Sequence, residues 1–100
     1  MANHLIDRMK KGDKKAIVDA LSHSGAIYRM NAISFCAIWK IKDPEVENRI
    51  KELKQDDVTL DGYRVSDFAF AALDLMGIEA YTGNRIFIKN LIASKFEFLL

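Results

Sequence analysis

The side chains that most often carry out catalysis or hold metal ions are scarce in this sequence. It has two histidines, His4 and His23, and one cysteine, Cys36. A zinc site needs three or four ligands at motif spacing, and no acid-rich cluster surrounds either histidine. Cys36 lies in the most apolar stretch of the chain, where a thiol is a small core side chain rather than a nucleophile. We therefore expect a non-enzymatic protein with no catalytic residues, no metal site and no cofactor.

A second feature with functional meaning is a concentration of carboxylates. Between Glu52 and Glu79 the chain carries seven acids and two bases, whereas the net charge of the whole chain is +1. A surface of this kind is complementary to a cationic protein, and the alternative is a face that water alone solvates. The residues that we expect to contact a partner are Asp56, Asp57, Asp61, Tyr63, Arg64, Asp67 and Asp74.

The opposite charge gathers near the N-terminus. These bases suggest an alternative function, a nucleic-acid-binding helical domain that uses a basic patch. The low net charge makes nucleic acid the less expected partner, and a solvated helix face is the simpler interpretation. The basic residues of this patch are Arg8, Lys10, Lys11, Lys14 and Lys15.

The composition indicates one folded domain over residues 1–100. Apolar residues make up 50% of the chain and charged residues 29%, values typical of globular proteins and not of disordered ones. A single cysteine excludes an internal disulfide bond. The sequence has no apolar run of the kind found in signal peptides or membrane-spanning helices, so we expect a cytoplasmic protein without a membrane segment.

The elements that must position these residues are all helices. Apolar residues recur with a helical period, and Gly12 and Gly77 are placed as helix terminators. Residues 43–45 (Asp-Pro-Glu) are the clearest helix start, because aspartate caps, proline fits the first turn and glutamate favours the helix dipole. The apolar C-terminal residues Phe96, Phe98, Leu99 and Leu100 are expected to fold back as a hydrophobic cap. The predicted helices span about 2–11, 14–23, 26–41, 44–54, 61–76 and 84–95.

Two segments of the chain repeat each other. Residues 28–41 and 63–76 align at an offset of 35 without a gap. A repeated unit of this length is typical of solenoids, whose units bury their apolar faces against one another. Each unit is expected to contain an outer amphipathic helix, a turn and an inner buried helix. The identical positions are Tyr28/Tyr63, Arg29/Arg64, Phe35/Phe70 and Ala37/Ala72.

The differences between the two copies suggest where function lies. Asp67 and Asp74 of the second copy replace Ala32 and Trp39 of the first. Because burying an unpaired carboxylate costs several kcal/mol, we expect both to point to solvent or to a partner. The loop before the second inner helix is two residues longer and contains Asp56-Asp57, and insertions in repeats often lie on the binding face.

On these residues the chain resembles HEAT-like repeat proteins over about residues 13–94. Such repeats open the outer helix with Asp-Pro-Glu, as at 43–45, and begin the inner helix with an apolar residue and an arginine. The resemblance implies a short right-handed α-solenoid of helical hairpins. It also implies that an inner-helix arginine pairs with an aspartate of a neighbouring turn, for which Asp43 and Asp57 are the candidates.

The resemblance also suggests a function. Small bacterial HEAT-like proteins include immunity proteins, which neutralise a co-inherited toxin. Together with the acidic segment, this implies a protein-binding module that blocks a cationic toxin through an acidic face. A catalytic role has the least support and requires a closed pocket around His23 or Tyr81.

Overall fold

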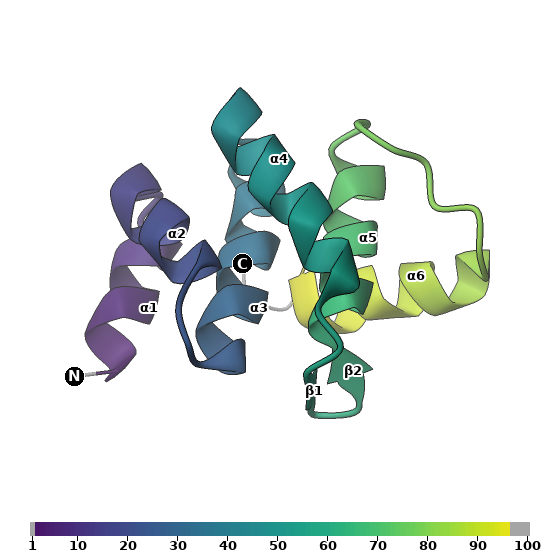
Figure 1. Cartoon of the computed structure of the whole chain (residues 1–100), viewed down its shortest axis with the longest axis horizontal. Helices are drawn as coiled ribbons and strands as arrows, with labels where there is room; N and C mark the ends of the chain where they lie inside the picture. Colours follow the sequence, from purple (N-terminus) through teal and green to yellow (C-terminus); the bar gives the residue numbers. More distant parts are fainter. Residues whose placement is uncertain (1, 97–100) are drawn as a thin grey trace.

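The computed structural model describes residues 2–96, with side chains from His4 onward (Figure 1). Within this range helices predominate and the only sheet is a two-stranded hairpin, which confirms the all-α class. The helices are α1 (Ala2–Lys10), α2 (Lys14–Leu21), α3 (Ala26–Ile38), α4 (Pro44–Glu52), α5 (Val65–Leu75) and α6 (Arg85–Leu91). The shorter elements are a 3₁₀ turn η1 (Leu53–Gln55), a hairpin of strands β1 (Thr59–Leu60) and β2 (Tyr63–Arg64), and a π-helical turn η2 (Ile92–Phe96).

Local capping chemistry sets where several helices begin and end. The side chain of Asp43 caps α4 by accepting a hydrogen bond from the backbone N–H of Glu45 at 2.9 Å, and Pro44 occupies the first turn. Gly12 follows α1 with a φ of +81°, and Gly77 follows α5 with a φ of +74°. Glycine enters this left-handed region without steric cost, so the predicted helix start and both predicted stops are confirmed.

The helices pack as two hairpins side by side. α2 packs on α3, α4 packs on α5, and an extensive contact between α3 and α5 joins the pairs, with a smaller one between α2 and α4. α1 covers the outer side of the first pair by contacting α2 and α3 (Figure 1). The inner helices α3 and α5 are apolar almost all round, as helices between others must be. The fully buried side chains of the core include Ile17, Leu21, Phe35, Ile50 and Leu73.

The second inner helix begins later than predicted. The repeat predicts a helix from residue 61, but residues 59–64 form the β1–β2 hairpin and α5 begins at Val65. Asp61 and Gly62 have φ values of +57° and +84°, the two positive angles that a tight type I′ hairpin turn requires. The aligned residues 28 and 29 are helical, so the two copies are structurally equivalent only from Met30 and Val65 onward.

The last helix does not begin a third unit of the stack. Figure 1 shows α6 running crosswise to α4 and α5, and η2 then contacts α3. The triplet Asn-Arg-Ile occurs at 48–50 and again at 84–86. Asn48 lies inside α4 whereas Asn84 is the N-cap of α6, so the two triplets occupy different structural positions. Phe96 is 1% exposed and packs on Phe68 with ring centroids 5.6 Å apart. Phe96 thus has the role expected of the C-terminal cap, while Phe98, Leu99 and Leu100 lie outside the described residues.

Candidate protein-binding site

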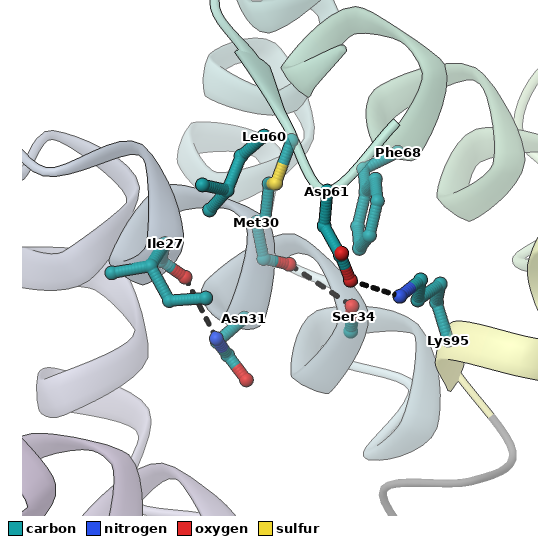
Figure 2. A pocket seen from close by; sticks show the side chains of 8 residues that line it. All are labelled: Ile27, Met30, Asn31, Ser34, Leu60, Asp61, Phe68 and Lys95. Atoms are coloured by element: carbon teal, nitrogen blue, oxygen red, sulfur yellow. Dashed lines mark hydrogen bonds and ion pairs between the residues drawn. The ribbon is translucent and has the colours of Figure 1, made fainter. Parts of the chain in front are cut away.

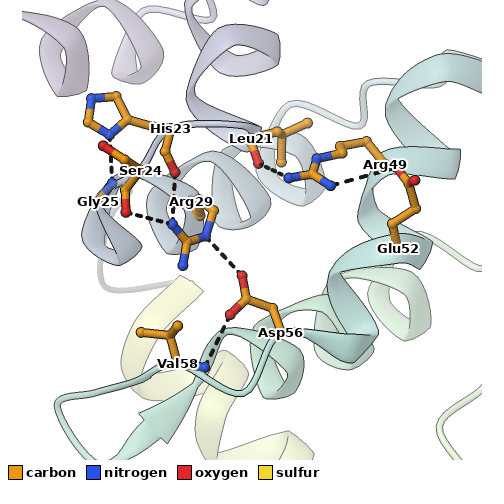
Figure 3. Close-up of polar contacts among 9 residues, drawn as sticks. All are labelled: Leu21, His23, Ser24, Gly25, Arg29, Arg49, Glu52, Asp56 and Val58. Atoms are coloured by element: carbon orange, nitrogen blue, oxygen red, sulfur yellow. Dashed lines mark hydrogen bonds and ion pairs between the residues drawn. The ribbon is translucent and has the colours of Figure 1, made fainter.

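Arg29 joins the two helical hairpins through a largely buried ion pair. Its Nε donates to Asp56 Oδ2 at 2.9 Å, and its Nη1 donates to the backbone carbonyls of His23 at 2.8 Å and Ser24 at 2.9 Å (Figure 3). The Arg29 and Asp56 side chains are 11% and 17% exposed. Asp56 also accepts from the backbone N–H of Val58 at 3.1 Å, which holds the loop that leads into the hairpin.

The two aspartates predicted as partners of Arg29 lie elsewhere. Asp43 caps α4 and accepts from Lys14 Nζ at 2.6 Å. Asp57 is exposed and forms no ion pair within residues 2–96. Asp56 has extended backbone angles, so successive side chains point to opposite sides; Asp56 faces Arg29 and Asp57 faces solvent.

The aligned arginine of the second copy has a different role. Arg64 is the N-cap residue of α5, and its side chain is 58% exposed. Its backbone N–H donates to Asp67 Oδ2 at 2.9 Å, as in a capping box, and the Asp67 side chain is only 13% exposed. The ring of Tyr63 packs in an aromatic cluster with Phe68 and Phe87. Tyr63 is thus packed into the fold, whereas the exposed Arg64 side chain does not reproduce the buried ion pair of Arg29.

Asp74 fixes the long connection between α5 and α6. Its carboxylate accepts from Arg85 Nη1 at 2.5 Å and from the backbone N–H of Tyr81 at 2.8 Å. The hydrogen bond from Arg85 holds the pKa of Asp74 below its ordinary value of 3.8, with help from the Tyr81 N–H and against the effect of partial burial. The Asp74 side chain is 16% exposed.

The expectation that Asp67 and Asp74 point to solvent or to a partner is therefore wrong. The argument from the cost of burial applies to an unpaired carboxylate, and both of these carboxylates have donors inside the chain. Asp67 caps helix α5, and Asp74 pairs with the guanidinium of Arg85, eleven residues later in the sequence.

Asp61 is exposed but also has a cationic partner. It lies in the hairpin turn, and Lys95 Nζ donates to its Oδ2 at 2.6 Å. This hydrogen bond and the charge of Lys95 lower the pKa of Asp61 from its ordinary value. Three carboxylates of the acidic segment are thus paired with bases from outside it, namely Arg29, Arg85 and Lys95. Among the aspartates predicted to contact a partner, Asp57 alone has no ion pair or cap contact within the described range.

A small apolar pocket lies beside the hairpin, between α3, α5 and η2 (Figure 2). Its volume is about 180 Å³. Met30 and Phe68, which are 4% and 6% exposed, form part of its lining. Ile27, which is 46% exposed, and Leu60 of the hairpin complete its apolar wall. The inserted loop of the second copy therefore does form one wall of a surface hollow.

The polar groups in the pocket wall already have partners. Ser34 and Asn31 donate to backbone carbonyls one turn earlier in α3, at 2.9 and 2.7 Å, and Lys95 is paired with Asp61 (Figure 2). A cavity of about 150 Å³ with an apolar lining accommodates a benzene ring, whereas drug-sized ligands occupy about 300–1,000 Å³. The pocket therefore matches one aromatic or aliphatic side chain better than a cofactor or a polar metabolite.

The side chains that could act in catalysis form hydrogen bonds or ion pairs within the chain, or are buried. His23 accepts a hydrogen bond at Nδ1 from the backbone N–H of Gly25 at 2.9 Å. Burial raises the pKa of the Cys36 thiol to about 12, which keeps it protonated at neutral pH. An open hollow of about 520 Å³ lies beside Tyr81, and its carboxylate, Glu79, is paired with Lys54 at 2.8 Å. Within residues 2–96 no three His, Cys, Asp or Glu side chains gather as metal ligands.

The sequence interpretation missed most of the residues that line the pocket. Lys95 and Asp61 are 34 residues apart, and only the crosswise path of α6 brings them together. Nothing in the sequence distinguishes Ile27 and Leu60 from ordinary apolar positions. One indication was present, because Asp61-Gly62 is a typical hairpin turn and a hairpin there would remove residues 59–64 from the helix.

Comparison of the chain with known protein families, curated proteins and solved structures gives no match. No helix within the described range is both long and apolar enough to span a bilayer. The geometry of the pocket and of its surroundings is therefore the basis for assigning a function.

Proposed function

We propose that the chain is a non-enzymatic protein-binding module whose partner inserts one apolar side chain into the pocket between α3, the hairpin and η2. The pocket itself is the observation that carries this proposal. It is lined by Ile27, Met30, Leu60 and Phe68, it has the volume of a single ring or branched side chain, and its polar groups are already paired. Interfaces draw most of their affinity from a few such buried anchors.

Charge around the pocket supports a cationic partner. Asp57 is exposed without an ion pair in the described part of the chain, and Asp61 is 77% exposed on the pocket wall. A basic residue next to the inserted apolar side chain would lie near the carboxylate of Asp61, and Asp57 adds unpaired negative charge to the loop that leads into the hairpin. The acidic contribution is therefore narrower than the sequence suggests, since it comes from the hairpin loop and not from Asp67 or Asp74.

The proposal also includes a HEAT-like solenoid as the architecture and toxin immunity as the biological role. Two packed hairpins, α2 with α3 and α4 with α5, support a short HEAT-like solenoid. The Arg29–Asp56 pair supports it too, although the aspartate is neither Asp43 nor Asp57. In this setting the chain is a bacterial immunity protein that binds a cationic toxin in the cytoplasm.

A displayed library of short random peptides tests the binding chemistry without knowledge of the natural partner. Selection on the folded chain should enrich peptides that carry one large apolar residue beside Lys or Arg. A scrambled set with the same composition, in which the apolar and basic residues are separated, is the control. Enrichment of acidic peptides, or no enrichment above the control, would overturn the proposal.

A further inference from the structure

The α1–α2 turn and the end of α3 meet at the opposite end of α3 from the pocket. Trp39 Nε1 donates to the backbone carbonyl of Met9 at 3.2 Å, and Lys14 Nζ pairs with Asp43 at 2.6 Å. These contacts bring residues 9–14 and 39–43 together, although about thirty residues separate them in the sequence. None of these residues lines the apolar pocket described above.

Trp39 is held as an open aromatic platform in this region. A Cβ placed on Gly12 would lie 3.3, 3.4 and 3.6 Å from three atoms of the indole, so Gly12 is against one face of the ring. The side chain is nevertheless 48% exposed, so part of the ring remains accessible from solvent. A ring that is fixed by a hydrogen bond and partly exposed is suited to stacking against another flat group.

Unpaired lysines are concentrated on the two segments that meet at this ring. Residues 7–15 and 39–43 together contain seven bases and three acids, and two of the acids, Asp13 and Asp43, are paired with Arg8 and Lys14. The remaining lysines are all exposed, and none forms an ion pair within the described residues: Lys10, Lys11, Lys15, Lys40 and Lys42. Lys40 and Lys42 were not part of the basic patch seen in the sequence, which ends at Lys15.

The backbone at Lys40 is strained. Helix α3 ends at Ile38, and Lys40 then has a φ of +52°, while its N–H donates to the carbonyl of Ala37 and the N–H of Ile41 donates to that of Cys36. This is a Schellman ending, in which glycine is the usual residue; Gly77 occupies the same position after α5. A lysine is thus held beside Trp39 at a position where glycine would be more stable.

From this geometry we propose that the Trp39 face binds single-stranded nucleic acid, with a base stacked on the indole and the flanking phosphates bound by the five lysines. Exposed bases stack on aromatic side chains irrespective of sequence, and lysines follow the phosphate backbone. An acidic protein segment would use the lysines but not the exposed part of the ring. The surface is independent of the pocket, so either assignment can fail without the other.

The chain has a single tryptophan, which makes its fluorescence a direct report on this surface. Titration with a short oligothymidylate at low ionic strength should quench Trp39 emission with saturation. The logarithm of the affinity should fall with the logarithm of the salt concentration, with a slope of about −0.7 for each phosphate neutralised. Absence of quenching at low salt overturns the proposal, as does binding of anionic vesicles or polyglutamate when the oligonucleotide does not bind.

Substitutions separate this surface from general stability and net charge. Lys42→Glu should weaken oligonucleotide binding about fivefold, whereas Lys89→Glu, an equal change of charge at an exposed position of α6, should leave it unchanged.

Lys40→Gly should raise the unfolding temperature while weakening binding, a combination that a purely structural role for Lys40 does not produce. Binding of a labelled oligonucleotide, followed by anisotropy, should fall about tenfold in Trp39→Leu and be largely kept in Trp39→Phe. Equal effects of Lys42→Glu and Lys89→Glu, or unchanged binding in Trp39→Leu, would refute the assignment.

Discussion

The guanidinium of Arg29 on α3 donates through Nε to the carboxylate of Asp56 at 2.9 Å, and this pair connects the first helical hairpin to the loop of the second. Two further hydrogen bonds from Arg29 Nη1 fix the turn at residues 23–24. The loop that Asp56 anchors leads directly into the β1–β2 hairpin, which forms one wall of the apolar pocket. The position of the pocket wall thus depends on a contact between the two halves of the chain.

Arg29→Ala should therefore destabilise the fold, since it leaves a largely buried carboxylate without its partner. We expect a loss of about 3 kcal/mol in the free energy of unfolding, measured by chemical denaturation. Arg64→Ala is the matched control, because Arg64 is the aligned arginine of the second copy and is 58% exposed. It should change the free energy by no more than about 0.5 kcal/mol. Equal effects of the two substitutions would contradict the different roles assigned to these arginines.

Asp74→Asn should weaken the fold in a way that depends on pH. The folded-state pKa of Asp74 lies below its ordinary value of 3.8, so its contribution is present above that pH and is lost as the pH falls through the folded-state pKa. At neutral pH the loss should be about 2 kcal/mol, as for hydrogen bonds to a charged group. The difference between wild type and variant should shrink below pH 3.8. A difference that stays constant from neutral to acidic pH would exclude the ion pair with Arg85 as its source.

Gly62 tests the conformation of the hairpin turn. Its φ is +84°, and a Cβ built there meets nothing within 4 Å, so a substitution is penalised by backbone strain alone. Gly62→Ala should cost about 1 kcal/mol in unfolding free energy and lower the affinity for pocket-binding peptides. Gly62→Asn should cost less, because asparagine enters the left-handed region more readily. If alanine were tolerated as well as asparagine, the turn would not have the conformation described.

Asp57 tests the charge of the partner. Asp57→Lys should weaken binding of the selected basic peptides about fivefold, mainly through slower association and a reduced dependence on salt. Asp19→Lys, an equal change at an exposed position of α2, should have little effect. Association and dissociation rates measured by surface plasmon resonance at two salt concentrations distinguish these results. Matching effects at both positions would leave only net charge, and not the hairpin, as the source of attraction.

Local chemistry explains which parts of the fold were predictable from the sequence. The helix start at residues 43–45 and the stops at Gly12 and Gly77 depend on neighbouring residues, and the structure confirms them. The burial of the inner helices follows from their apolar surface and is also confirmed. Such features need no knowledge of how distant segments meet.

The incorrect predictions concern contacts between residues far apart in the sequence and positions where the two repeat copies differ in structure. The alignment placed a helix at residue 61, although Asp61-Gly62 favours a tight turn and the hairpin forms there. The pairs of Asp74 with Arg85 and of Asp61 with Lys95 depend on the path of α6, which the sequence pattern does not encode. Carboxylates that looked free in the sequence are therefore engaged, and the apolar pocket was not foreseen.

The most direct test of the central claim is the affinity of the peptides enriched by selection for two isoleucine variants. Ile27→Lys places a charge in the wall of the pocket, while Ile86→Lys makes the same change on α6 at a residue that is 71% exposed and does not line the pocket. Both positions are exposed enough for the fold to tolerate lysine, which circular dichroism would confirm. In isothermal titration calorimetry Ile27→Lys should weaken binding at least about tenfold and Ile86→Lys should not change it. Full affinity in the Ile27 variant, or an equal loss in both, would show that the partner does not use the pocket.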